Sequence, residues 1–214
     1  MPDIDKKIFK ELLPDCKTVL DIGSFNGKDA HELSYVLDCD VHCFEPDKDN
    51  FEKIKGLQND RLILWPYAIG AWHGKAPFVK SKNHPASHSM RAPLKHKDVW
   101  PGIKFSRTSH MVKCTTLDAW HLAVLKQAPI DLIWIDVNGA EGDVIKGGTQ
   151  ALKVTKYVYI EFQEVELFKG AMNREKTLLR LPDFELLGEY NFGGNYGNLL
   201  LKNKNQELWL TGTQ

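Results

Sequence analysis

The stretch from Thr18 to Lys28 constrains the fold more than any other part of this chain. It begins with a short apolar run that ends on Asp21, continues through a turn containing Gly23 and Gly27, and leads into a segment with helical periodicity. A strand, a glycine turn and a helix in this order are typical of a parallel α/β sheet, which presents a nucleotide at the carboxyl ends of its strands. We therefore predict an α/β fold with a mostly parallel sheet and helices on both faces.

The identity of the nucleotide is indicated by two residues near this turn. Glu45 ends the second apolar run, 24 residues after Asp21. In nucleotide-binding folds, a carboxylate about 20 residues after the glycine turn binds the ribose hydroxyls. Phe25 stands where a dinucleotide-binding turn has its middle glycine, which argues against a diphosphate. S-adenosylmethionine, which carries an adenosine but no phosphate, fits this pattern, with its charged amino-acid end held by turn amides and Asp21. The alternative is an ordinary βα turn with capping residues.

Length and charge limit the other possibilities. The 214 residues suit one domain, which we predict to span residues 1–214. The formal net charge of zero makes binding to nucleic acid or to a membrane surface unexpected. The four cysteines form no disulfide pattern, and neither a signal peptide nor a membrane span is evident, so we expect a cytoplasmic protein. The oligomeric state cannot be read from the sequence.

Further elements follow the same α/β pattern. An amphipathic helix over Ile4–Leu13 should occupy the N-terminal part, residues 1–16. A third strand over residues 61–65 should bring Tyr67 and Ala68 beside the adenine. Pro77 marks residues 76–79 as an edge strand, because proline cannot donate to a ladder.

The segment from Lys80 to His110 has no clean periodicity. It holds seven lysines and arginines against one acid, and a loop of this length is usually functional or disordered. We interpret it as a lid over the active site that contributes Ser87, His88 and Arg91 to an acceptor site, and its charge favours an anionic acceptor. A solvated flexible loop is the alternative, and zinc binding is disfavoured because nothing supports His84 and His88 at ligand spacing.

The second half of the chain supplies two more strands that end in acids. The almost continuously apolar run 130–135 leads to Asp136, and residues 156–160 lead to Glu161. A helix should follow over residues 142–152, weakened at Gly147 and Gly148, and the strands 184–190 and 197–202 should form a hairpin. The ends of parallel strands share one edge of the sheet, so Asp21, Glu45, Asp136 and Glu161 predict an active site there.

Several motifs together resemble the FkbM-type S-adenosylmethionine-dependent methyltransferases. These are residues 19–27 (VLDIGSFNG), 44–47 (FEPD), 116–118 (TLD) and 131–141 (DLIWIDVNGAE), in matching order and spacing from about Thr18 to Glu161. The resemblance implies a seven-stranded class I methyltransferase fold with a C-terminal antiparallel hairpin. It also implies O-methylation of a hydroxyl on a sugar, a glycan or another small metabolite.

The resemblance also implies roles for particular residues. The cofactor would be bound by residues at the strand ends: Asp21, Gly23, Ser24, Gly27, Glu45, Pro46, Tyr67, Ala68, Asp136 and Val137. Asp136 would lie near the transferring methyl group, and Glu141 would line or brace the site. Asn138 stands where the family pattern I-D-V-E-G-x-E has its first glutamate, so a proton-accepting role at that position is lost. Together with Glu161, Asn138 is a candidate acceptor ligand.

Methyl transfer to a hydroxyl benefits from a base, and the sequence offers Asp136 first, His88 second and Glu141 third. Three rival functions remain at this point. A nicotinamide-dependent oxidoreductase is opposed by Phe25, and a nucleic-acid methyltransferase by the neutral charge. A non-catalytic nucleotide-binding module is favoured only by Asn138.

Overall fold

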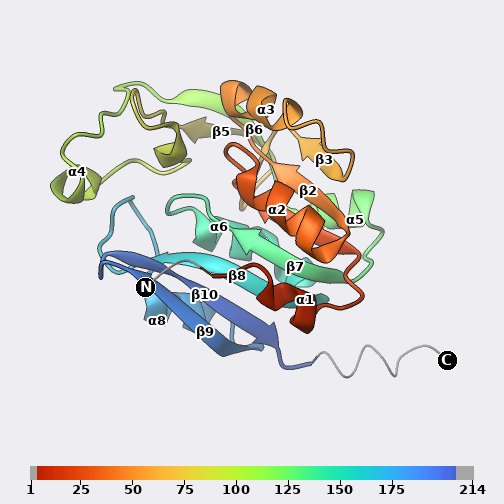
Figure 1. Ribbon diagram of the computed structural model, residues 1–214. Coiled ribbons are helices and arrows are strands. Elements are labelled where there is room, and N and C mark those ends of the chain that lie inside the picture. The colour runs from red at the N-terminus through yellow and green to blue at the C-terminus, as the bar shows by residue number, and fades with distance from the viewer. Residues whose placement is uncertain (1–3, 206–214) are drawn as a thin grey trace.

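The computed structural model describes residues 4–205 and has a mostly parallel seven-stranded sheet at its centre (Figure 1). The strand order is β3-β2-β1-β7-β8-β10-β9, in which the first five are parallel and β10 runs antiparallel to both neighbours. The strands are β1 (Thr18–Ile22), β2 (Asp40–Phe44), β3 (Leu62–Trp65), β7 (Ile130–Ile135), β8 (Thr155–Gln163), β9 (Phe184–Phe192) and β10 (Tyr196–Asn203). The predicted class I fold with its C-terminal hairpin is confirmed.

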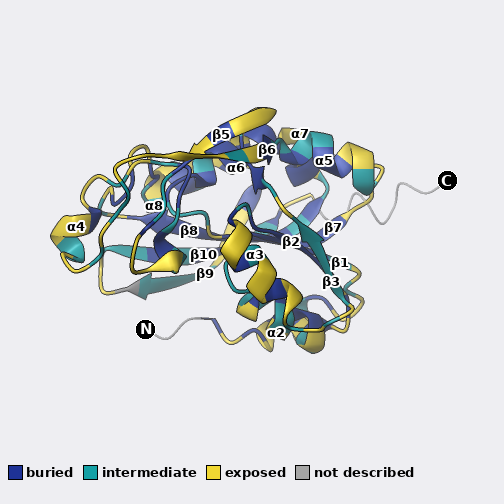
Figure 2. Ribbon diagram, turned by 90° about the horizontal axis from the view of Figure 1, so that it is seen from above, coloured by how far each residue is buried: buried dark blue, intermediate teal, exposed yellow. Residues whose placement is uncertain are grey.

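Helices cover both faces of this sheet (Figure 2). One face carries α1 (Ile8–Leu12), α2 (Lys28–Leu37) and α3 (Lys48–Lys55), and the other carries α5 (Leu117–Val124), α6 (Glu141–Gly147), α7 (Thr149–Lys153) and α8 (Arg174–Arg180). Strand β7 is buried on both faces, which explains its continuous apolar sequence. Its residues alternate between two cores: Ile133 packs on the α5 and α6 side, and Leu132 on the α1 and α2 side.

Two helices differ from the sequence-based prediction. The N-terminal helix extends only over Ile8–Leu12, although the flanking Ile4 and Leu13 are buried as expected. Residues 1–3 of the predicted N-terminal segment, like residues 206–214 of the predicted domain, lie outside the described part of the chain. The helix predicted over residues 142–152 is divided into α6 and α7 at Gly148. A Cβ atom on Gly148 would lie 2.8 Å from Leu117 Cδ2, so glycine allows α5 to approach this break closely.

A second, three-stranded sheet has the order β4-β6-β5 and was not predicted as a separate sheet. It consists of β4 (Ala68–Ile69), β5 (Gly74–Phe78) and β6 (His110–Thr115), with β5 at its edge as Pro77 indicated. The segment between β5 and β6, residues 79–109, contains the 3₁₀ turn η1 (Pro85–Ser87) and the short helix α4 (His96–Val99). We call it the β5–β6 segment; it is the yellow-green part at the left of Figure 1.

The β5–β6 segment is folded against the rest of the molecule. Isolated bridges pair Val79 with Ser89 and Ser81 with Phe105, and a third joins Pro93 to Phe168, which follows β8. The segment therefore lies at the carboxyl ends of the central strands, where the sequence predicts the active site.

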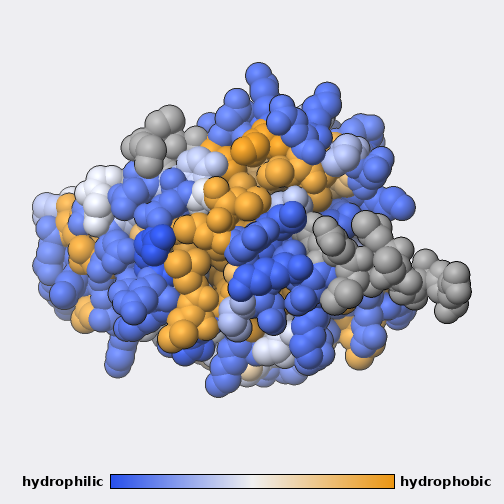
Figure 3. All heavy atoms as spheres, turned by 90° about the horizontal axis from the view of Figure 1, so that it is seen from below, coloured by the Kyte–Doolittle hydropathy of each residue, from blue (hydrophilic) through white to orange (hydrophobic). Residues whose placement is uncertain are grey.

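The surface seen from below shows a band of apolar residues on an otherwise hydrophilic face (Figure 3). The edge strand β9 exposes Leu186 and Leu187. Over residues 4–205, none of the helices is long and apolar enough to cross a membrane.

Candidate active site

A cavity open to solvent, with about 810 Å³ of empty space including its mouth, lies at the carboxyl ends of β1, β2 and β7. Most of the predicted cofactor residues line it: Asp21, Gly23, Ser24, Glu45, Pro46 and Ala68 from the β1, β2 and β4 side, and Asp136 and Val137 from the β7 side. His88 and Asn138, which were predicted to contact the acceptor, also line it. The topology thus gathers at one edge residues that are more than a hundred positions apart in the sequence. We call this space the donor cavity.

The glycine turn after β1 is bound to the strands on both sides of it. Gly23 and Ser24 donate to the Phe44 carbonyl, and Asp136 N donates to the Ile22 carbonyl. Gly23 has φ 97°, and a Cβ atom there would lie 1.8 Å from the Asp136 carbonyl oxygen. Only glycine can therefore occupy this position while β1 and β7 approach each other so closely.

Asp21 lies at the bottom of this turn with an incompletely satisfied carboxyl group. Its side chain is buried, and among the described residues its Oδ2 atom has no hydrogen-bond partner. Burial raises the pKa of Asp21 to about 8. An unpaired buried carboxyl oxygen in a cavity wall fits a cationic ligand group, such as the ammonium of a methionine moiety.

Glu45 is held in place by two backbone amides. Its Oε2 accepts from Phe25 N at 2.8 Å and its Oε1 accepts from Asp47 N at 2.7 Å, while burial raises its pKa to about 7. A turn that binds a diphosphate presents its backbone amides to the phosphates. Here the Phe25 amide donates to Glu45, so it is not available to a phosphate. The fixed carboxyl group keeps lone pairs for the two hydroxyls of a ribose.

Gly27 and Tyr67 are two predicted cofactor residues that the structure does not bring to this cavity. Gly27 precedes α2 with φ 74°, and a Cβ atom there would meet Ile54 at 2.9 Å, so it serves the packing of α3. The Tyr67 ring packs against Phe44 and Trp65. Ile69 lines the cavity together with Ala68, and both belong to the second sheet.

Comparison with known proteins agrees with this geometry. A family model described as the methyltransferase FkbM domain matches residues 21–190. The curated 2-O-methyltransferase NoeI of Sinorhizobium fredii (strain NBRC 101917 / NGR234) is 34% identical over 194 residues, covering 86% of this chain and 79% of that protein. This chain belongs to the FkbM methyltransferase family. It is a methyltransferase whose methyl donor is S-adenosylmethionine.

Solved structures support the fold alone. TehB from Haemophilus influenzae matches 94% of this chain and 62% of its own with a TM-score of 0.54 and 14% identity. The N-terminal domain of EvdMO1, solved in the presence of SAH and D-fucose, matches 92% of this chain and 80% of its own with a TM-score of 0.51 and 10% identity.

Asn138, where this chain departs from the FkbM pattern, attaches the β5–β6 segment to the end of β7. Its Nδ2 donates to the carbonyls of Ala86 at 2.8 Å and His88 at 3.2 Å, and its own carbonyl accepts from Ser89 Oγ at 2.7 Å. Asn138 has φ 53°, a left-handed conformation that asparagine tolerates well. A glutamate could not donate to the Ala86 and His88 carbonyls. With asparagine at this position, the chain lacks the family's carboxylate and gains two hydrogen bonds to the β5–β6 segment.

Glu141 lies next to this turn and does not line the donor cavity. It is 1% exposed and its Oε1 accepts from Val137 N and Gly139 N, at 3.2 and 3.1 Å, while burial raises its pKa to about 7. Of the two roles that the family resemblance implied for Glu141, the structure supports bracing, and its candidacy as a base finds no geometric support.

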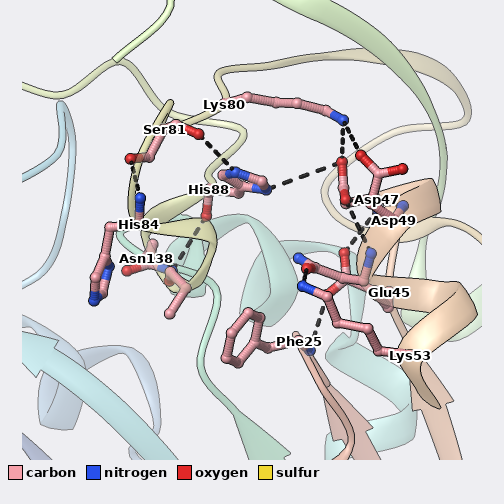
Figure 4. A network of polar contacts seen from close by, with 12 residues as sticks. Phe25, Glu45, Asp47, Asp49, Lys53, Lys80, Ser81, His84, His88 and Asn138 are labelled. Atoms are coloured by element: carbon pink, nitrogen blue, oxygen red, sulfur yellow. Dashed lines mark hydrogen bonds and ion pairs between the residues drawn. The ribbon is translucent and has the colours of Figure 1, made fainter. Parts of the chain in front are cut away.

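His88 and Lys80 both face Asp47 from the β5–β6 segment (Figure 4). The His88 Nε2 atom lies 3.2 Å from the Ser81 carbonyl and its Nδ1 lies 3.9 Å from Asp47 Oδ2, while burial lowers its pKa. Lys80 forms an ion pair with the same carboxylate, whose Oδ1 caps α3. Among the described residues the Nδ1 atom has no hydrogen-bond partner, so His88, which lines the donor cavity, remains the second candidate base.

Arg91 is likewise occupied. Its guanidinium forms hydrogen bonds of 2.5 Å to both carboxylate oxygens of Asp143 on α6. This pair attaches the middle of the β5–β6 segment to α6. The structure therefore gives Arg91 a structural contact in place of the predicted acceptor contact.

Ser87 and Glu161, the remaining predicted acceptor residues, line a second cavity of about 650 Å³. It shares Ala86 and Asn138 with the donor cavity, so the two spaces are neighbours. Sequence reasoning missed its other polar and aromatic residues, among them His96, Trp100, Gln163 and Tyr196. They lie in or next to the one-turn helix α4 and at the ends of β8 and β10, where no periodicity marks them.

Proposed function

We propose that this methyltransferase transfers a methyl group to a hydroxyl oxygen of a saccharide. Support comes from the 2-O-methyltransferase NoeI, its relative at 34% identity, and from the second cavity beside the donor cavity. The observation that carries the proposal is the donor cavity itself, where Asp21, Glu45 and Asp136 converge next to a separate space for an acceptor.

The chain's own residues would act chiefly by positioning. When bound, S-adenosylmethionine supplies a methyl group activated by a sulfonium. Asp21 would bind the ammonium, Glu45 would accept hydrogen bonds from the ribose hydroxyls, and Ala68 and Ile69 would pack against the adenine. Holding reactants in line accounts for much of the acceleration of such a displacement.

Asp136 is the residue that we propose as the base. An alcohol is a weak nucleophile, and a carboxylate that takes its proton as the new C–O bond forms contributes about 10²–10⁴-fold. Asp136 follows β7 and lines the donor cavity, which Glu141 does not line.

The first test is isothermal titration calorimetry with S-adenosylhomocysteine, with NAD⁺ as the control ligand. Micromolar binding of the former and none of the latter would support the proposed cofactor site. A transfer assay with radiolabelled methyl donor and a panel of saccharides then tests the acceptor class. Binding of S-adenosylhomocysteine without transfer to any hydroxyl would support the rival reading of a non-catalytic module.

A nucleic-acid acceptor is disfavoured by the charges at the site. Within the described residues, neither cavity is lined by a lysine or an arginine, whereas nucleic-acid binding depends on cations that contact phosphates.

A further inference from the structure

The second cavity has an aromatic wall. It lies between the β5–β6 segment and the ends of β8 and β10, and it is lined by Trp100, Phe168 and Tyr196. The Trp100 and Tyr196 rings are 5.7 Å apart between centroids at 69°, and Trp100 is half-buried. Aromatic faces of this kind offer apolar contact area to one side of a flat or ring-shaped ligand.

The same cavity contains buried polar atoms that lack partners. Gln163 and His96 are each 2% exposed, and among residues 4–205 the Gln163 Oε1 and His96 Nδ1 atoms have no hydrogen-bond partner. Leaving a buried donor or acceptor unsatisfied is unfavourable. Glu161 lies beside them and accepts from Gln163 Nε2 at 3.1 Å. Ligand hydroxyls, which both donate and accept, would satisfy all three side chains.

The charges around this cavity favour a neutral ligand. Its lining contains no lysine or arginine in the described part of the chain. Lys80 and Arg91 of the β5–β6 segment are paired with Asp47 and Asp143. Burial, with repulsion from Asp136 and Glu141, holds the pKa of Glu161 well above its usual range, so Glu161 adds little negative charge. The local charge excess of the sequence therefore does not reach this space.

We propose that the second cavity binds one neutral sugar ring of the acceptor. Trp100 and Tyr196 would pack against its C–H face, while Glu161, Gln163 and His96 would bind its hydroxyls. A further hydroxyl of the same ring would reach the donor cavity past Asn138 and Ala86, which line both spaces. This assignment rests on the proposed function and adds to it the location, the charge and the ligands of the acceptor ring.

The test measures acceptor binding and turnover separately. Saturation-transfer NMR on the protein with bound S-adenosylhomocysteine would use methyl glycosides of neutral hexoses and 6-deoxyhexoses, with methyl glucuronide as the charged probe. We expect a strong saturation-transfer signal on a neutral glycoside and a weak one on the glucuronide. Trp100→Ala and Gln163→Leu should each weaken that signal and raise the acceptor KM on the order of 10-fold, with unchanged affinity for S-adenosylhomocysteine. Trp72→Ala, which removes an exposed tryptophan outside both cavities, is the matched control.

Two results would overturn the assignment alone. One is methyl transfer to a neutral saccharide with the same KM in wild type, Trp100→Ala and Gln163→Leu, which would leave the proposed function standing. The other is preferential binding of the glucuronide. If calorimetry shows S-adenosylhomocysteine binding but no saccharide is bound or methylated, the proposed acceptor class fails, and the sugar-ring assignment fails with it.

Discussion

Burial and mutual repulsion govern the carboxyl groups that gather at the carboxyl edge of the sheet. Burial, followed by the nearby Asp29, raises the pKa of Asp21. Burial, followed by Asp136 and Glu141, raises the pKa of Glu161. The edge therefore carries less negative charge near neutral pH than its sequence suggests.

Asp21 makes cofactor binding depend on pH. A bound ammonium stabilises the ionised carboxyl group, whose pKa in the free protein is about 8, so affinity for S-adenosylhomocysteine should rise between about pH 6 and pH 8 as less work is needed to remove the proton. Asp21→Asn should bind more weakly and show a flatter pH profile. Calorimetry in two buffers of different ionisation enthalpy measures the released proton; equal release by both proteins would contradict the role.

The same raised pKa affects the stability of the ligand-free protein. The folded state keeps the Asp21 proton up to about pH 8, whereas the unfolded chain loses it near ~3.9. The folded state thus binds more protons between these values, and its free energy of unfolding should fall as pH rises through this window. Between these pH values the melting temperature of Asp21→Asn should fall less than that of the wild type, as thermal unfolding of both proteins would measure.

Asp136 should be needed for turnover more than for folding. Asp136→Asn keeps the shape of the side chain and removes its ability to accept a proton. We expect kcat to fall about 10²–10⁴-fold, with the Tm and the S-adenosylhomocysteine affinity nearly unchanged. A folded Asp136→Asn enzyme with wild-type kcat would exclude Asp136 as the base.

At the scale of elements, capping residues explain why several observed helices begin where the sequence predicts them. Asp47 accepts from Asp49 N and Asn50 N and begins α3, and Thr116 caps α5 through Ala119 N. Asp118, the last residue of the T-L-D motif, accepts from the first amides of α7. Asp47 and Thr116 act on amides within three positions, so the local sequence carries their signal. The contacts of Asp118 lie 32 and 33 positions away and have no such local signal.

Asn138 provides the prediction at this scale. Asn138→Asp keeps the size of the side chain and tolerates the left-handed backbone, but it places a carboxylate against the carbonyls of Ala86 and His88. With about 1–3 kcal/mol lost, amide hydrogen exchange over residues 84–90 should become on the order of 10-fold faster. Unchanged exchange there would mean that other contacts hold the segment.

At the scale of the whole molecule, the central sheet and the β5–β6 segment differ in how far sequence predicts them. The succession of apolar strands along the chain follows from periodicity, and the terminal hairpin follows from its turn-rich loop. The common edge of Asp21, Glu45 and Asp136 follows from the parallel arrangement of their strands. The segment is held by contacts between residues far apart in the chain, such as Arg91 with Asp143 and Pro93 with Phe168. No local pattern encodes these pairings, so the aromatic cavity and the attachment by Asn138 could not be predicted.

Because the donor cavity is closed on one side by the β5–β6 segment, cofactor binding should stabilise that segment. Pro85, Ala86, His88 and Met90 line the cavity opposite the sheet. Hydrogen exchange measured by mass spectrometry should slow over residues 79–91 when S-adenosylhomocysteine is added. Peptides from the β9–β10 hairpin, which does not line that cavity, serve as the internal control. Equal protection of both regions would indicate a global effect instead.

The attachment by Asn138 has a consequence at the level of the genetic code. Codons for asparagine and glutamate differ at their first and third bases, so a single nucleotide change cannot convert one into the other. The single-step intermediates encode aspartate, which cannot donate to the Ala86 and His88 carbonyls, or lysine, a long side chain on a left-handed backbone of φ 53°. We therefore expect position 138 and positions 86–89 to have changed together during the divergence of FkbM proteins.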